Sequence, residues 1–474
     1  MLSQEIKDEL LDCLKVVQDM LKGDVALSRE QMKTITDIFQ ASANICNEAL
    51  TMQDVIARKE LTNNDKQNEP LLSICIPTYN RVEELKRSLG AIIREFYGRD
   101  NVEILVSDNC SPDETELLMK NVLCSYPRIR YYRHDENIGP TRNFISCYQR
   151  ACGKYVWLIS DDDFLLENAG DLVMEMLLTE MPVFATVNAH WSSGTDGYRV
   201  FTDKNRFMNS VGIYITFISA LIFRRDYIME IGNFEQYYDM LLPQSMIAVE
   251  TMRHEGKYVV ITQRSMGASG VQSVSYDLYK VWLEEYSNVL LKAAVAAGFD
   301  TELMGNIFYR ELKLNILNFV INFRQTSAGE STWDKTIFRR VLRRYPDLLP
   351  IYDLAVNTPV QELSQVYIKI MMMVFRNIFC YCSSYKNIYF FGKENVITSL
   401  AGVLSSNDVH IAGKYTDWSI ENLKQFACNN LNKNEDAVVI ALPQGCRVDL
   451  EDVLMEYYGE NYYWQDVLEV YMHQ

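Results

Sequence analysis

Three consecutive aspartates, Asp161, Asp162 and Asp163, directly follow the apolar run KYVWLIS at residues 154–160. Carboxylates that are buried together repel one another and their pKa values rise, so such a cluster needs either solvent or a cation. Mg²⁺ and Mn²⁺ bind carboxylate and diphosphate oxygens, and they neutralise the charge that develops on a leaving phosphate. The pattern therefore predicts a divalent-metal site, with a solvent-facing polar turn as the simpler alternative.

Other polar residues stand at the ends of apolar runs in the same part of the chain. Thr78 follows the run LSICIP, and Asp108 ends the run VEILVSD. Segments of helical periodicity separate these runs, and strands that alternate with helices favour a parallel sheet covered by helices. Because ligands bind at the carboxyl ends of the strands in open α/β sheets, we expect these residues to line one crevice with the aspartates.

The elements that must position these residues follow from periodicity and turn signals. Strands are expected at residues 72–77, 102–108, 129–132, 154–160, 183–190 and 211–223. Helices are expected at residues 82–96, 113–124, 143–151 and 243–254. The predicted class is therefore α/β for this part of the chain.

The chain divides into four expected regions: a helical segment at 1–66, an α/β domain at 70–275, a helical region at 276–385 and a small Rossmann-like domain at 386–474. The first is expected to be an interaction or oligomerisation element, with packing on the next domain as the alternative.

The third and fourth regions each carry one feature of interest. In the third, the run FRRVLRRY at 338–345 reads either as a solvated helix face or as a surface for anionic lipid or phosphate. In the fourth, strands are expected at 387–392, 409–413 and 436–443, with a helix at 396–404. Gly392 lacks the further glycines of a dinucleotide fingerprint, so a docking or regulatory module is expected there.

Composition excludes several classes of protein. The chain has 474 residues, a formal net charge of -17 and 48% hydrophobic residues, so it is expected to bury a normal core. The acidic balance argues against a nucleic-acid binder. The 11 cysteines include no CxxC pair, and no apolar stretch reaches the roughly 20 residues of a membrane span. A soluble, cytoplasmic protein is expected, with peripheral contact at the inner face of the plasma membrane as an option.

Four ordered motifs in this chain resemble the family 2 glycosyltransferases, which have the GT-A fold. The motifs are SICIPTYNR at 73–81, EILVSDNCSPDET at 103–115, ENIGPTRNF at 136–144 and GKYVWLISDDDFL at 153–165. The resemblance covers about residues 70 to 260. It implies a GT-A domain that binds a nucleotide-sugar, flanked by the N-terminal helices, the helical middle region and the Rossmann-like module.

The resemblance also implies roles for single residues. Asp108 corresponds to the carboxylate that reads the nucleobase, and an acceptor-only group suits a base N–H. Arg142 belongs to the loop beside the donor diphosphate, where a guanidinium can neutralise an oxygen. Without the resemblance, Asp108 reads as the cap of a turn and Arg142 as part of an exposed helix start. The other implied donor-binding residues are Thr78, Tyr79, Asn137, Gly139 and Asp161. The implied metal ligands are Asp162 and Asp163, and the implied cation is Mn²⁺ or Mg²⁺.

The catalytic base is where the chain departs from the family pattern. Members commonly carry an acidic pair after a GNF-like turn, but Pro243 and Gln244 fall near that place here. An amide cannot take a proton from an acceptor hydroxyl. Asp239 is the preferred base because it precedes the expected helix, although a surface carboxylate is an equally good reading. The other residues considered are Glu235, Glu250 and His190.

The expected function is transfer of a sugar from a nucleotide-diphosphate sugar to an acceptor hydroxyl, by a metal-dependent inverting displacement. The acceptor is a glycan, a lipid-linked glycan or a protein. Two alternatives remain. One is a non-catalytic GT-A scaffold or sugar-nucleotide-binding protein, which the missing acidic pair supports. The other is a sugar-phosphate nucleotidyltransferase, against which the absence of a glycine-rich loop after the first strand counts.

Overall fold

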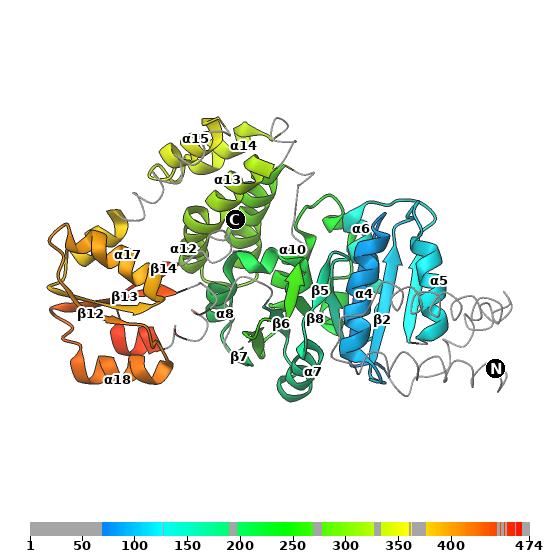
Figure 1. The fold of residues 1–474 in the computed structure, drawn as a ribbon. Helices are drawn as coiled ribbons and strands as arrows, with labels where there is room; N and C mark the ends of the chain where they lie inside the picture. The colour runs from blue at the N-terminus through cyan, green and yellow to red at the C-terminus, as the bar shows by residue number, and fades with distance from the viewer. Residues whose placement is uncertain are drawn as a thin grey trace, which may run out of the picture.

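The computed structural model describes residues 69–466 (Figure 1), apart from residues 127, 189–196, 269–276, 327–332, 360–361, 363–375, 443–445, 447–449, 451–452 and 460. The predicted helical segment at 1–66 lies outside the described residues. No helix among the described residues is both long and apolar enough to cross a bilayer.

The central feature is an eight-stranded sheet in the order β3-β2-β1-β4-β8-β6-β9-β7. Its strands are β1 Leu72–Thr78, β2 Val102–Asp108, β3 Ile129–Arg133, β4 Tyr155–Leu158, β6 Phe184–Val187, β7 Tyr198–Phe201, β8 Leu221–Arg224 and β9 Tyr258–Ile261. The first four are parallel to one another, whereas β8 runs antiparallel between β4 and β6. A separate two-stranded sheet pairs β5 (Asp163–Leu165) with β10 (Met266–Ala268).

Helices cover both faces of this sheet. They are α4 Val82–Phe96, α5 Thr115–Ser125, α6 Pro140–Arg150, α7 Ala169–Glu180, α8 Lys204–Val211, α9 Arg225–Met229 and α10 Pro243–Thr251. Successive side chains of a strand point to opposite faces. Ile74 and Ile76 of β1 therefore pack in one core with α4, and Cys75 between them packs in the other core with α6. This alternation between two cores explains why β1 is buried at every position.

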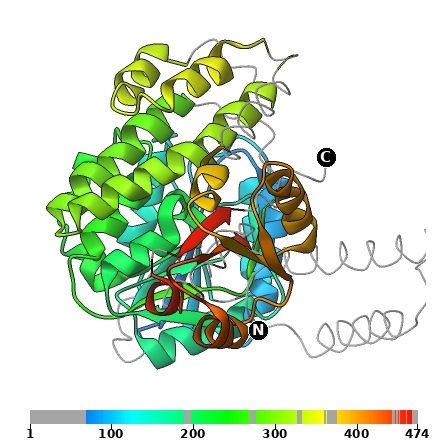
Figure 2. The same ribbon diagram turned by 90° about the vertical axis from the view of Figure 1, so that its left-hand side faces the viewer.

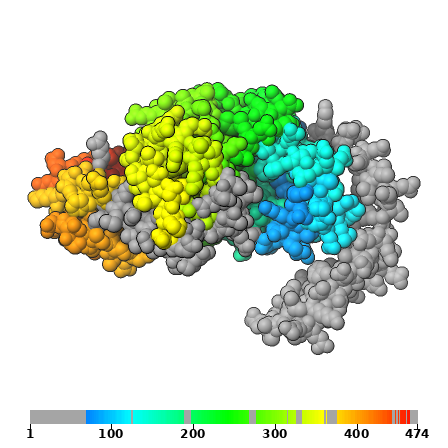
Figure 3. Space-filling model, turned by 90° about the horizontal axis from the view of Figure 1, so that it is seen from above, coloured from blue at the N-terminus to red at the C-terminus, as the bar shows by residue number. Residues whose placement is uncertain are grey.

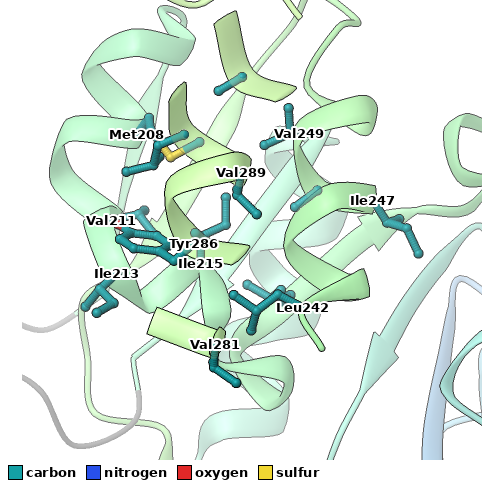
Figure 4. Close-up of a cluster of buried hydrophobic side chains, with 14 of the residues drawn as sticks. Met208, Val211, Ile213, Ile215, Leu242, Ile247, Val249, Val281, Tyr286 and Val289 are labelled. Atoms are coloured by element: carbon teal, nitrogen blue, oxygen red, sulfur yellow. The ribbon is translucent and has the colours of Figure 1, made fainter. Parts of the chain in front are cut away.

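The helical region shares a core with the second half of the sheet domain. It comprises η5 Tyr279–Glu285, α11 Tyr286–Asn288, η6 Val289–Ala294, α12 Thr301–Glu311, η7 Leu312–Ile316, α13 Leu317–Thr326, α14 Lys335–Leu342 and α15 Leu349–Asn357. One cluster of buried side chains joins Phe207 of α8 and Ile247 of α10 to Tyr286 and Phe308. Figure 4 shows side chains of both regions meeting in this cluster. The predicted boundary near residue 275 thus divides the sequence but not the hydrophobic core.

The prediction of a strand at residues 211–223 is wrong over most of that range. Helix α8 ends at Val211, Gly212 has φ +53, and two 3₁₀ turns follow at η2 Gly212–Thr216 and η3 Ile218–Ala220. Only the end of the run joins the sheet, as β8. A continuous apolar run does not distinguish a strand from other buried structure. Here Gln244 Nε2 and Ser245 Oγ of α10 donate to the carbonyls of Thr216 and Ile215, at 2.7 and 3.1 Å.

A second, smaller sheet forms the C-terminal module. Its four strands are all parallel, in the order β12-β11-β13-β14. The elements are β11 Asn387–Gly392, α17 Glu394–Ser405, β12 Ile411–Tyr415, α18 Ile420–Asn430, β13 Asp436–Leu442, η11 Leu454–Tyr458 and β14 Tyr462–Asp466. Helices α17 and α18 pack in two separate cores on opposite faces of this sheet (Figures 1 and 2).

Glycine is required at the end of β11. A Cβ atom on Gly392 would lie 2.1 Å from the carbonyl oxygen of Ala441 on β13.

The α/β class, the helical region and the separate small module predicted from the sequence are confirmed. The pattern missed the strands β5, β7, β9, β10 and β14 and the helices α7, α8, α9 and α18.

Candidate active site

The predicted site residues follow strands that are neighbours in the sheet. Strand β1 lies between β2 and β4, and Thr78 at the end of β1 is directly opposite Asp108 at the end of β2. The three aspartates follow β4 on the other side of β1. The carboxyl ends of these parallel strands therefore bring all of these residues to one edge, which is where α/β sheets bind ligands.

Two of the three aspartates share a guanidinium. Thr78 Oγ1 donates to Asp161 Oδ2 at 2.8 Å. Arg81 Nη1 lies 3.1 Å from Asp161 Oδ1 and 3.2 Å from Asp162 Oδ2. Tyr79, between Thr78 and Arg81 in the chain, is 43% exposed. The sequence prediction missed Arg81, although it ends the PTYNR motif directly before α4.

The third aspartate points elsewhere. Asp163 begins β5 opposite Ala268 of β10, and its Oδ2 accepts a hydrogen bond from Ser219 Oγ at 2.6 Å. Burial raises the pKa of Asp161 to about 6 and that of Asp163 to about 7, although the hydrogen bonds from Thr78 and Ser219 oppose the shift. Within the described residues, no three His, Cys, Asp or Glu side chains form a group that could hold a metal ion.

The metal pair Asp162 and Asp163 stays a prediction, and the geometry also offers Asp161 and Asp162 together to a divalent cation. Mg²⁺ is commonly held by one or two carboxylates together with substrate phosphates and water, so a third protein ligand is not required. The Arg81 guanidinium already bridges the first pair, which shows that one cationic group can contact both carboxylates. The side chain of Asp162 is 35% exposed, and its two oxygens contact Ser160 Oγ and Arg81 Nη1.

The predicted nucleobase reader, Asp108, is fully buried and its carboxylate is occupied. Its Oδ1 accepts a hydrogen bond from the Ser111 N–H at 2.8 Å. Its Oδ2 accepts bonds from Tyr131 Oη and Arg133 Nη1, both at 2.6 Å. A hydrogen bond from Asp108 to a nucleobase would require one of these donors to move, so that role stays a prediction.

The loop before α6 is held by reciprocal amide contacts. Asn109 Nδ2 donates to Asn137 Oδ1 at 2.8 Å, and the Ile138 N–H donates to Asn109 Oδ1 at 2.9 Å. Gly139, with φ +85, precedes Pro140 at the first position of α6. The first turn of α6 therefore lies at the same edge of the sheet. Its N–H groups and the helix dipole favour binding of an anion there.

The start of α6 contacts the segment that carries the predicted base. The Arg142 guanidinium lies 4.7 Å from the ring centroid of Tyr238. Thr141 Oγ1 donates to the Met240 carbonyl at 3.0 Å. Asp239 lies between these two contacts in the chain and is exposed. The structure therefore places the predicted base residue beside the predicted diphosphate loop.

The other residues considered as the base fit the role less well or lie outside the described part. Glu250 forms an ion pair with Arg253 at 2.5 Å. Glu235 is exposed and is the first residue of the 3₁₀ turn η4 Glu235–Tyr237. Gln244 is buried, and its amide binds the Thr216 carbonyl. His190 is among the residues that the structure does not describe.

Comparison with known proteins agrees with the motifs. Residues 73–232 match the family described as glycosyl transferase family 2. This part of the chain is similar to the family 2 glycosyl transferases. The resemblance predicted from the four motifs is thereby confirmed.

Individual relatives match only parts of their length. The abequosyltransferase RfbV of Salmonella typhimurium is 29% identical over 177 residues, which is 33% of this chain and 53% of that protein. The GalNAc(5)-diNAcBac-PP-undecaprenol β-1,3-glucosyltransferase of Campylobacter jejuni is 32% identical over 107 residues, 22% of this chain and 34% of that protein. The chain thus spans about half or less of these relatives' lengths. S. aureus TarS 1-349 is similar at 13% identity, over 64% of this chain and 91% of that chain, with a TM-score of 0.42, too low to support an inference.

The segment that carries Asp239 lies just after the matched residues 73–232 and is anchored by a residue of the helical region. Glu285 Oε2 accepts hydrogen bonds from the Leu241 and Leu242 N–H groups, at 2.6 and 2.9 Å. Burial raises the pKa of Glu285, although these two N–H groups oppose the shift. Glu285 therefore fixes the approach to α10 across more than 40 residues of sequence.

Replacing Glu285 with alanine is expected to lower the free energy of unfolding by about 1–2 kcal/mol, as for the loss of a helix-capping acceptor. Glu285→Gln retains an acceptor oxygen and should cost less. Chemical denaturation of both variants and the parent protein measures the free energies of unfolding and shows whether they follow this order. Equal stability of Glu285→Ala and the parent protein would show that the contact is not stabilising.

The hydrogen bonds of Asp108 are expected to make the stability of the fold depend on pH. Burial favours the neutral acid, but the bonds from Ser111, Tyr131 and Arg133 outweigh it and hold the pKa of Asp108 below its usual value. A carboxyl with a lowered pKa stabilises the fold above its unfolded pKa of about 3.9, and this stabilisation is lost as the pH falls through the folded pKa.

Asp108→Asn is therefore expected to lower the free energy of unfolding by about 2–3 kcal/mol at pH 7. The difference from the parent protein should shrink as the pH falls below about 3.9. Urea denaturation across this pH range measures both. Unchanged stability combined with weaker nucleotide binding would instead favour the nucleobase role that the resemblance implies.

Proposed function

We propose that this chain transfers a sugar from a nucleotide-diphosphate sugar to an acceptor hydroxyl, with inversion at the anomeric carbon. The observation that carries the proposal is the meeting of three groups at one edge of the sheet. These groups are the Asp161–Asp162 carboxylates, the first turn of α6, and the segment with Asp239. Together they offer what such a transfer requires: a place for a cation, a place for an anion and a proton acceptor.

The donor diphosphate would lie between the carboxylates and α6. Asp161 and Asp162 would hold Mn²⁺ or Mg²⁺, which neutralises charge on the leaving diphosphate when it is bound. The α6 N–H groups and Arg142 would bind the phosphate oxygens, and Asn137 and Gly139 shape that turn. Thr78 orients Asp161 through its hydrogen bond, and the exposed ring of Tyr79 is available to the nucleoside.

The acceptor would approach from the side of Asp239. Its carboxylate would take the proton of the acceptor hydroxyl as that oxygen attacks the anomeric carbon. The glucosyltransferase relative from C. jejuni is named for an undecaprenol-linked acceptor, which supports a lipid-linked glycan as the acceptor class. A cytoplasmic location with peripheral contact at the membrane fits this acceptor. Self-association through residues 1–66 remains a further proposal.

The alternatives are less favoured. A nucleotidyltransferase would need a glycine-rich phosphate loop after β1, and PTYNR does not supply one. A non-catalytic scaffold was supported by the missing acidic pair, but Asp239 offers a carboxylate beside the diphosphate loop.

The experiment that tests the proposed function is a thermal-shift panel of nucleotide-sugars with and without Mn²⁺. A true donor should stabilise the fold by RT ln(1 + [L]/Kd), about 2.7 kcal/mol at 100 Kd, and should do so only with the cation. Donor hydrolysis or transfer is then assayed with the sugar that gives the largest shift. If no nucleotide-sugar shifts the melting temperature, the proposal is wrong.

A further inference from the structure

Helix α14 has one apolar face and one basic face. Ile337, Phe338 and Leu342 are buried in the core shared with the sheet domain. The exposed side of the helix and the turn that follows it carry five cations: Lys335, Arg339, Arg340, Arg343 and Arg344. We call these five residues the α14 basic face. Its concentration of positive charge contrasts with the formal net charge of -17 for the whole chain.

The acidic groups nearby only partly offset this charge. Asp334 caps the helix by accepting the Thr336 N–H at 2.8 Å. Glu284 of η5 forms an ion pair with Arg340, and Asp347 accepts a hydrogen bond from Tyr309 Oη. Among the exposed side chains of α14 itself, the charged ones are all basic. A helix that packs its apolar side into the protein core and exposes cations on its other side can bind an anionic surface by electrostatic attraction.

The α14 basic face is connected to the acceptor side of the proposed active site. Arg340 contacts Glu284, and the next residue, Glu285, anchors the segment that follows Asp239. Figure 1 places α14 and α15 together at one extremity of the molecule, and Figure 3 shows this part of the chain exposed in the view from above.

We propose that the α14 basic face docks the protein on an anionic phospholipid surface. The proposal extends the proposed function, because it would hold the acceptor side of the domain next to a membrane that carries a lipid-linked acceptor. Each basic side chain near such a surface strengthens binding by about fivefold at moderate ionic strength, so five of them suffice for reversible attachment.

The test is cosedimentation of the full chain with vesicles of phosphatidylcholine alone and with 30% phosphatidylglycerol (a composition chosen for the assay). Binding is expected only to the anionic vesicles and should be released by 0.5 M NaCl, because salt screens surface charge. The variant Arg339→Gln/Arg343→Gln/Arg344→Gln should bind about 100-fold more weakly. The matched control, Lys86→Gln/Lys414→Gln/Lys433→Gln, removes three exposed cations on other elements and should bind like the parent protein.

Several outcomes would overturn the proposal. Equal vesicle binding by the arginine variant and the parent would place the docking surface elsewhere. If both variants bound the vesicles equally weakly, the binding would depend on the net charge of the chain and not on the α14 basic face. Competition by 5 mM inorganic phosphate at constant ionic strength would indicate a site for free phosphate instead of a membrane surface. The donor-dependent thermal shift is measured on the same variants, so failure of docking is distinguishable from failure of the proposed function.

Discussion

Replacing Asp162 with asparagine is expected to lower the rate of sugar transfer by at least about 100-fold, with little change in melting temperature. Loss of an outer-shell partner of a metal typically costs 10–100-fold, so loss of a direct carboxylate ligand should cost at least as much. Asp162 is partly exposed, so its replacement should leave the core intact. Initial rates at saturating Mn²⁺ and a thermal melt measure the two quantities.

The matched comparison is Asp163→Asn. The two aspartates are neighbours in the chain, but Asp163 is buried against Ser219 and begins β5. We expect this variant to change the melting temperature and to retain Mn²⁺-dependent binding of the donor. A loss of Mn²⁺-dependent binding in Asp163→Asn, with normal behaviour of Asp162→Asn, would reverse the assignment and restore Asp163 as the ligand.

The second large effect is expected at Asp239. Asp239→Asn should lose at least about 100-fold in turnover while donor binding and melting temperature stay unchanged, because a positioned base contributes 10²–10⁴-fold. The residue is exposed, and its neighbours Tyr238 and Met240 make the contacts to α6. Removing its charge should therefore leave those contacts in place. Turnover at saturating donor and acceptor measures the loss.

Glu235→Gln and Glu250→Gln are the controls, assayed under the same conditions. Glu250 is already paired with Arg253, so its replacement should affect stability more than turnover. If Glu235→Gln or Glu250→Gln lost turnover and Asp239→Asn did not, the base would be that glutamate. Full activity in all three variants would leave His190 as the remaining residue to test.

The arrangement along the sheet edge was predictable because it depends on local patterns. Apolar runs that end in polar residues define where each strand stops, and a parallel sheet then brings those ends together. Thr78 opposite Asp108, with the aspartates one strand away, follows from this rule. The directions of single side chains do not follow from it. Asp162 and Asp163 adjoin in sequence, yet one faces Arg81 and the other Ser219.

Contacts over long sequence separations account for the remaining differences. Nothing near Asp108 in the sequence indicates that Arg133 and Tyr131 would occupy its carboxylate. Similarly, Glu285 reaches back more than 40 residues to the start of α10. The run at 211–223 was misassigned for a related reason. Its apolar residues indicate that it is buried, but they do not indicate a strand. Two of its backbone carbonyls accept hydrogen bonds from the side chains of Gln244 and Ser245 on the later helix α10.

The continuous core between the sheet domain and the helical region has a consequence for how such a chain can be recombined. A gene fusion made at residue 275 would separate Phe207 from Phe308 and leave apolar surfaces on both products. The two regions therefore depend on each other for a complete core. A chimera that contains only residues 70–275 of this chain is expected to aggregate. The C-terminal sheet is different, because its two cores are composed of its own side chains and the helix just before it. A fusion made just before that helix would therefore divide neither of these two cores.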